Sequence, residues 1–316
     1  MHDLWQAQVL KRWAPADVFH LMLHGTGIQL LERARREGMV TFGEPVMSHP
    51  QVLHEIVQKE HDRLKIAPPP PISKPFERLL RELDLCDCIH VASRFMRDSF
   101  IEKGYAPDRI FTSSYAADTS KFYPLTAAEQ ARVSDGKFRV ICAGQIVPRK
   151  GQHHLLEAWK RLGYPKSEAE LVLVGSINPV MRQVLKRYEG IFTYRGVVPH
   201  DQLRMEYGRS SMSVLPSMED GFGLVLAEAM GVGLPVVTTA NAGSADVVED
   251  GHNGYIVPAG NVEALMDRID RIRRDTARRL AMGQRSAELA RTTVSWSGYV
   301  DKLVEFYATA MRIKRL

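Results

Sequence analysis

One stretch of the chain, residues 214–239, restricts the fold more than any other: VLPSMEDGFGLVLAEAMGVGLPVVTT. Its first apolar residues predict the end of a strand, and a polar turn follows at residues 217–220. The glycines at 221 and 223 lead into a predicted helix over residues 224–230, and residues 234–239 predict a second buried strand. Strand, helix and strand in this order form a βαβ unit, so we expect an α/β protein with a parallel sheet.

The loop before this helix has the chemistry of a site for a charged ligand. The free N–H groups and the positive end of a helix dipole face the same point, which favours an anion. Asp220 and Glu228 are eight positions apart, about two turns if both are helical, so they can face one side. Acids beside an anion site suggest hydroxyl ligands, such as those of a sugar and a ribose.

The same stretch resembles the donor site of retaining GT-B glycosyltransferases of the family-4 type. That family typically has an acid, Gly-Phe-Gly-Leu, a second acid, Ala-Met and Gly-Leu-Pro-Val-Val. The resemblance implies that the first acid binds hydroxyls of the donor sugar and that Glu228 binds the nucleotide ribose. The first acid is either Asp220 or its neighbour Glu219, and the backbone of residues 222–225 would approach the diphosphate.

A second segment, residues 138–151, carries the rest of the resemblance. It predicts a buried strand, a glycine and then Pro-Arg-Lys-Gly, where the family has Gly-Arg and, a few residues later, Lys-Gly. Lys150 matches the family lysine, which offsets charge that builds on the diphosphate leaving group. Gln145 stands where the family has arginine, and Arg149 is the nearest cation that could compensate.

The resemblance implies a set of donor-binding residues, of which Lys150, Asp220 and Glu228 would be catalytic. The whole set is Gly144, Gln145, Arg149, Lys150, Val197, Ser217, Glu219, Asp220, Gly221, Phe222, Gly223, Leu224, Val225 and Glu228.

The length of 316 residues suggests about two domains of ~150 residues each. We expect a GT-B architecture, in which two Rossmann-like domains face each other across a cleft and ligands bind at the carboxyl ends of the strands. The expected divisions are an acceptor-side domain at 1–125, a linker at 126–137, a donor-binding domain at 138–300, and a helix at 301–316 that packs back on the first domain.

Residues 1–125 predict only about four strands, fewer than the acceptor-side domain of the family usually has. We therefore expect the first domain to be incomplete. The strand predicted at 17–23 is apolar on both faces and has no lysine or proline to guard an edge, so we expect a partner or self-association to cover it. The family places a histidine after the strand predicted at 39–42. Gly43 holds that place here, and His49 is the nearby candidate for an acceptor-side residue.

Composition limits the partners. The net charge is +5, and the basic residues near 268–279 alternate with acids, which is typical of a solvated helix face. Docking on an anionic membrane surface is the alternative, and nucleic acid is not expected because aromatic and basic residues are not interleaved. The three cysteines fit a reducing compartment, so we expect a cytoplasmic protein, with contact to the inner face of the membrane as an option.

The predicted function is transfer of a hexose from a nucleotide diphosphate sugar to a hydroxyl on a sugar or lipid-linked acceptor, with retention. No Asp-x-Asp metal site is present in the sequence, so we expect neither a metal nor a cofactor beyond the nucleotide sugar. Two alternatives remain: a donor-binding protein without transfer, because the acceptor half is short, and a related phosphorylase. The sequence does not define the sugar, the base or the acceptor.

Overall fold

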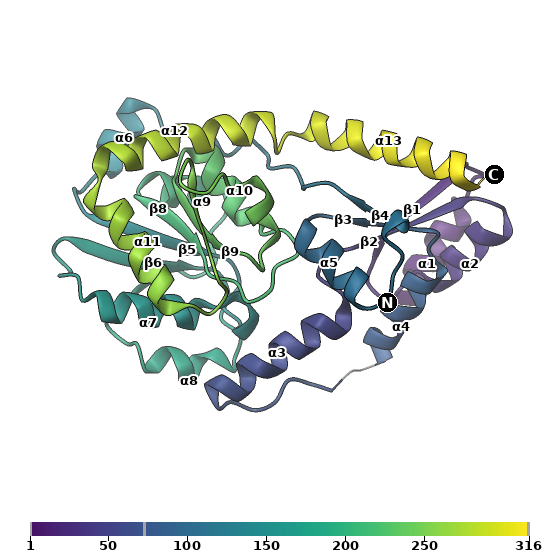
Figure 1. Ribbon diagram of the computed structural model, residues 1–316, viewed down its shortest axis with the longest axis horizontal. Helices are drawn as coiled ribbons and strands as arrows, with labels where there is room; N and C mark the ends of the chain where they lie inside the picture. Colours follow the sequence, from purple (N-terminus) through teal and green to yellow (C-terminus); the bar gives the residue numbers. More distant parts are fainter. Residues whose placement is uncertain (1, 72–73, 315–316) are drawn as a thin grey trace.

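The computed structural model describes residues 2–71 and 74–314, without the side chains of residues 2–5, 7 and 75. The chain forms two α/β units that lie side by side (Figure 1). One buried apolar cluster includes residues of both units, among them Met96 and Phe100 of the first and Phe222 and Met230 of the second. The units are therefore joined by a continuous core.

The first unit is built on a four-stranded parallel sheet with the order β1-β2-β3-β4. The four strands predicted for this half are confirmed, and residues 67–71, between two helices, have no regular secondary structure. Its elements are α1 (His2–Lys11), β1 (Val18–Leu23), α2 (Ile28–Arg36), β2 (Val40–Pro45), α3 (Pro50–Leu64), α4 (Lys74–Leu85), β3 (Cys88–Val91), α5 (Arg94–Glu102), η1 (Pro107–Arg109) and β4 (Ile110–Thr112).

The second unit has a six-stranded parallel sheet with the order β10-β9-β8-β5-β6-β7. Counted from β5, this is the doubly wound order 6-5-4-1-2-3, which reverses between β5 and β8. Its strands are β5 (Phe138–Ala143), β6 (Ala169–Val174), β7 (Thr193–Tyr194), β8 (Met212–Leu215), β9 (Val236–Thr239) and β10 (Gly254–Val257). Its helices are α6 (Ala127–Val133), η2 (Pro148–Lys150), α7 (Gln152–Leu162), α8 (Met181–Lys186), α9 (His200–Gly208), α10 (Leu224–Val232), η3 (Gly243–Val247), α11 (Val262–Arg274) and α12 (Thr276–Thr292).

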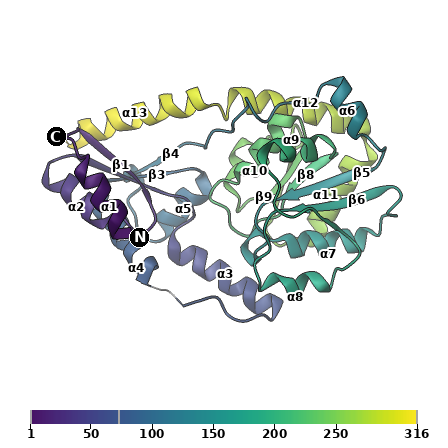
Figure 2. The ribbon, with the colours of Figure 1, turned by 180° about the vertical axis from the view of Figure 1, so that it is seen from behind.

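The last helix, α13 (Trp296–Lys314), returns from the second unit to the first, as both ribbon views show (Figures 1 and 2). Its buried Ala310 packs on Phe42 of β2 and Cys88 of β3, with Phe306, Tyr307 and Met311 of the helix around them. Lys314 at its end lies 2.9 Å from the Asp87 carboxylate. The helix thus covers one face of the first sheet.

Three local features add to what the sequence predicts. The segment at 126–137 contains helix α6, because the Thr126 side chain and Glu129 form a reciprocal capping box. The single helix predicted over 262–290 is two helices, because Asp275 ends α11 and its carboxylate accepts the Arg278 N–H that begins α12. Strand β1 lies at the sheet edge, and within the described residues its strand partner is β2 alone.

Among the helices in residues 2–71 and 74–314, none combines the length and the apolar character that crossing a bilayer requires.

The packing of α13 can be tested through Phe42, which is fully buried and touches the rings of Phe111 and Tyr307. We expect Phe42→Ala to lower the free energy of unfolding by about 3–5 kcal/mol, because it leaves a cavity between sheet and helix. Val304→Ala, on the exposed side of the same helix, should change it by less than about 0.5 kcal/mol. Urea denaturation followed by circular dichroism measures both, and equal effects would contradict this packing.

Candidate functional site

All the predicted donor residues except Val197 follow the carboxyl ends of β5 and β8, where the strand order reverses. Residues 144–151 follow β5, and residues 216–223 follow β8. Ligands of open parallel sheets bind at such a point, because the two connections leave the sheet in opposite directions. The fold therefore brings together two loops that are about 70 positions apart in the sequence.

Two ion pairs join these loops. The Lys150 ammonium contacts the Asp220 carboxylate, and Arg149 Nη1 lies 3.2 Å from Glu219 Oε2. The backbone adds to this, since the Arg149 carbonyl accepts the Met218 N–H at 2.8 Å. The basic turn after β5 is thus fixed in register with the acidic turn after β8.

Glycines allow the loops to come this close. Gly151 has φ +67°, and a Cβ there would overlap the carbonyl oxygen of Pro216. Gly223 has φ +83° and precedes α10 without any side-chain cap, so the first N–H groups of that helix have no capping side chain. Uncapped N–H groups at the positive end of a helix form a site for an anion.

The two neighbouring acids have different surroundings. Glu219 is fully buried, and both its oxygens are engaged, Oε1 by the Ser48 N–H at 3.0 Å and Oε2 by Arg149. Burial raises the pKa of Glu219, although Arg149 opposes the shift. The Asp220 carboxylate contacts Lys150, a cation that could turn to a ligand. The structure therefore favours Asp220 over Glu219 as the acid that reaches a ligand.

Glu228 lies on α10, the helix that follows the same loop. Its Oε2 is buried and has no hydrogen-bond partner among the described residues. Burial raises the pKa of this carboxyl, and His200 and Tyr207 offset only part of the shift. The buried Ser217 Oγ also lacks a partner in the described chain. Buried polar atoms without partners are costly, and hydroxyls of a ligand would satisfy them.

Within the part of the chain that the structure describes, no side chain of the other predicted residues makes a hydrogen bond or ion pair with this centre. Gln145 is exposed, and its carbonyl accepts the Gln152 side-chain N–H at 2.9 Å. Val197, in the loop after β7, is 73% exposed. Phe222 is buried, where it packs on Tyr115 of the first unit.

His49 has a packing role in this structure. It caps α3 through Nδ1, which accepts the Gln51 N–H at 3.3 Å. Its ring lies between Phe100 and Tyr105, with centroids 5.2 and 5.6 Å away. Burial lowers the pKa of His49 to about 4, so the ring is neutral at pH 7. The adjacent residue Ser48, rather than the His49 ring, contacts the acidic loop.

Two residues of the first unit were missed by sequence reasoning because their contacts cross between the units. Ser48 donates its N–H to Glu219. Ser93 caps α5, and its hydroxyl also donates to the Gly221 carbonyl at 2.8 Å. Both contacts join residues more than 120 positions apart, and no local pattern signals them.

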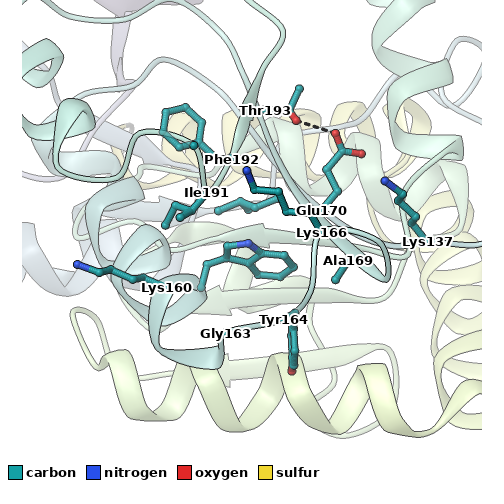
Figure 3. A pocket seen from close by; sticks show the side chains of 13 residues that line it. Lys137, Lys160, Gly163, Tyr164, Lys166, Ala169, Glu170, Ile191, Phe192 and Thr193 are labelled. Atoms are coloured by element: carbon teal, nitrogen blue, oxygen red, sulfur yellow. Dashed lines mark hydrogen bonds between the residues drawn. The ribbon is translucent and has the colours of Figure 1, made fainter.

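A cavity of about 410 Å³ lies at the opposite edge of the six-stranded sheet. Figure 3 shows its lining, which includes Lys137, Tyr164 and Thr193, with Thr193 hydrogen-bonded to Glu170. These residues lie at the amino ends of β5, β6 and β7. Because ligands of this architecture bind at the carboxyl ends, the cavity is not the donor site.

Two groups of side chains in the described part of the chain could hold a metal ion, and neither includes a donor residue. One consists of His20, Glu44 and His90, and the other of Glu60, His153 and His154.

The family model described as "Glycosyl transferases group 1" matches residues 126–289, just over half of the chain. Among curated relatives, the GDP-mannose-dependent alpha-(1-6)-phosphatidylinositol monomannoside mannosyltransferase of Mycobacterium tuberculosis is 27% identical over 60% of this chain and 53% of its own length. O-antigen chain mannosyltransferase B of Escherichia coli is 28% identical over 93% of this chain and 76% of its own length. The match to the mycobacterial relative thus spans about half of that protein.

Solved structures give the fold. Sucrose-phosphate synthase of Thermosynechococcus elongatus superposes with a TM-score of 0.77 over 99% of this chain and 77% of its own, at 21% identity. Anabaena HepE, solved in complex with UDP, gives a TM-score of 0.75 over 96% of this chain and 81% of its own, at 17% identity. The matched donor segments, the reversal in strand order and these similarities agree, and the chain belongs to the group 1 glycosyltransferases and has the GT-B fold.

Proposed function

We propose that this protein transfers a hexose from a nucleoside diphosphate sugar to a hydroxyl acceptor, with retention of configuration. The observation that carries the proposal is the Lys150–Asp220 pair, held beside the uncapped start of α10, with the unpartnered Glu228 oxygen on the same helix. The names of relatives support it, since two are mannosyltransferases and HepE was solved with UDP and glucose. GDP-mannose and UDP-glucose are therefore the first donors to test.

The diphosphate would bind between Lys150 and the N–H groups that begin α10. A diphosphate carries more charge than the Asp220 carboxylate, so it would compete for the Lys150 ammonium. The same ammonium would then offset the charge that builds on the leaving phosphate oxygen as the bond to the sugar breaks. No metal is needed in this scheme, because lysine and helix N–H groups provide the positive potential.

Asp220 would bind the hydroxyls of the sugar once Lys150 turns to the diphosphate. Glu219 is less suited, because Ser48 and Arg149 occupy both of its oxygens. Its proposed role is to hold the acidic loop against the first unit. Arg149 is paired with Glu219, so we expect it to add positive potential near the diphosphate rather than to contact it directly.

Glu228 would accept hydrogen bonds from the ribose hydroxyls through its free oxygen. Hydrogen bonds to charged groups contribute about 1.5–3 kcal/mol.

The acceptor would enter from the first unit, at the carboxyl ends of β1 and β2. A cavity of about 300 Å³ lies there, and its lining is mostly apolar: Leu23, His24, Pro45, Val46, Met47, Ser48, Pro50, Leu53, Phe76 and Leu79. Because Ser48 also contacts the donor loop, this cavity is next to the proposed sugar site. Its apolar lining favours an acceptor with an apolar group, and hence a lipid-linked one.

Such an acceptor would be met at a membrane surface. We propose a cytoplasmic protein that contacts the inner face of the membrane, with its three cysteines free and buried. Self-association through the edge of β1 remains a further proposal.

The transfer proposal is tested with the purified chain, GDP-mannose or UDP-glucose, and a lipid-linked or sugar acceptor. We expect release of the nucleoside diphosphate to depend on the acceptor, and the product to keep the anomeric configuration of the donor by NMR. Binding without acceptor-dependent release would favour a donor-binding protein. Turnover that needs inorganic phosphate instead of a nucleotide would favour a phosphorylase.

Single substitutions test the donor residues. Glu228→Ala should weaken nucleotide binding, and Lys150→Ala should slow turnover, each by about ten- to hundredfold, because each removes a charged hydrogen bond. Lys160→Ala on the exposed face of α7 and Glu305→Ala on α13 are matched controls that should behave like the parent. Calorimetry measures binding and a coupled assay measures turnover; parental values in both site variants would reject the assignment.

Glu228 should also lower the stability of the folded protein, by an amount that depends on pH. Because burial raises its pKa above the ordinary value of 4.5, the folded state favours the protonated form, and ionisation costs stability once the pH exceeds the raised pKa. Glu228→Gln, which stays neutral, should therefore have a higher Tm than the parent at pH 7.5 in the absence of ligand. The difference should shrink as the pH falls to 4.5, and Glu305→Gln should show no such trend. A Glu228→Gln Tm below the parental one at pH 7.5 would contradict this account.

A further inference from the structure

A buried polar cluster on the first sheet has no role in the proposed transfer. His20 of β1, Glu44 of β2 and His90 of β3 come from three adjacent strands. Their side chains face one another under α13, whose Tyr307 and Tyr299 contact the cluster. His90 is fully buried, Glu44 nearly so, and the His20 side chain is 17% exposed. A charged group in such a place needs compensation.

The cluster is not closed by hydrogen bonds. His20 Nε2 lies 2.9 Å and His90 Nδ1 lies 3.7 Å from the same oxygen, Glu44 Oε2. Both nitrogens are buried, yet neither makes a hydrogen bond within the described chain. Two ring nitrogens and a carboxylate oxygen thus converge on one point.

The second cluster gives a useful contrast. There, His153 and His154 are hydrogen-bonded to Glu60 Oε2 at 2.7 and 3.0 Å, and the Arg63 guanidinium lies 3.4 Å from the other Glu60 oxygen. That carboxylate is already satisfied and has a cation beside it. The Glu60 carboxylate therefore has hydrogen-bond partners in both histidines, whereas neither inner nitrogen beside Glu44 makes a hydrogen bond within the described chain.

The spacing of the Glu44 cluster suits a metal. With ligand bonds of about 2.0–2.1 Å, tetrahedral zinc places its ligand atoms about 3.3 Å from one another. The observed separations of 2.9 and 3.7 Å lie on either side of this value, and all the ligand atoms lie within 4.8 Å of one another. Small side-chain rotations would equalise them.

In both histidines, the ring nitrogen that points away from Glu44 has a hydroxyl partner, as the outer nitrogen of a metal-bound histidine usually has a hydrogen-bond partner. His20 Nδ1 lies 2.5 Å from the Tyr307 hydroxyl, and His90 Nε2 lies 2.7 Å from Ser113 Oγ. If these nitrogens carry the protons and donate, the inner nitrogens present lone pairs to the centre. In this tautomer, two acceptor nitrogens face an acceptor carboxylate. A cation between them would replace this repulsion with three favourable contacts.

We propose that His20, Glu44 and His90 bind one divalent transition metal, for which the two imidazoles and one carboxylate favour zinc. The ion would join three strands beneath α13 and so fasten the last helix to the first unit. The buried Tyr115 hydroxyl, which interacts with the Glu44 carboxylate, would offer a fourth ligand. The site is separate from the donor loops, and the proposal does not depend on the proposed transfer.

The test uses the full chain, stripped with a chelator and then titrated with zinc in a buffer that contains a competing chromophoric chelator. We expect one equivalent of zinc by elemental analysis after gel filtration, and a rise in Tm when the ion is added. Cobalt in place of zinc should give the visible absorption of a four-coordinate site. Glu44→Gln and His20→Asn should each reduce zinc affinity at least tenfold and abolish the Tm response. His153→Asn, in the other cluster, is the matched control and should bind as the parent does.

Circular dichroism of each metal-free variant shows whether it is folded, and His20→Asn at the partly exposed position is the milder change if Glu44→Gln unfolds. The proposal is overturned if the folded parent takes up no zinc at micromolar free concentration. It is also overturned if zinc binding survives in folded His20→Asn and Glu44→Gln, or if His153→Asn loses the ion.

Discussion

The site depends on one electrostatic contact, the pairing of the basic turn after β5 with the acidic turn after β8. Lys150 with Asp220 and Arg149 with Glu219 hold two loops against each other at the point where the strand order reverses. The pairs differ in what they leave free. Glu219 is buried and both of its oxygens are engaged, whereas among the described residues the Lys150 ammonium and the Asp220 carboxylate have only each other as ion-pair partners. We propose that one pair holds the loops together and that the other exchanges partners with a charged ligand.

The same loops tie the two units together. Glu219 accepts a hydrogen bond from Ser48, and the Gly221 carbonyl accepts one from Ser93. Farther from the sheet edge, Glu60 of α3 binds His153 and His154 at the start of α7, only three residues after Lys150. This arrangement suits an enzyme that must align a donor in one unit with an acceptor in the other.

The sequence predicted what is local and missed what is not. The βαβ unit at 214–239 was readable because a strand, a glycine loop and a helix follow one another within 26 residues. The choice between Glu219 and Asp220 was not readable, since it depends on Ser48, 171 positions away. The Glu44 cluster was also hidden, because its three members come from three different strands and are covered by a helix from the other end of the chain. The capping box of Thr126 and Glu129 was local and could have revealed α6.

The most direct test of the account is a crystal structure of this chain with GDP or UDP bound. The account predicts the diphosphate between the Lys150 ammonium and the first N–H groups of α10, with the ribose hydroxyls on Glu228 and the Lys150–Asp220 contact broken. A nucleotide bound in the cavity lined by Tyr164 and Thr193, with the Lys150–Asp220 pair intact, would contradict it.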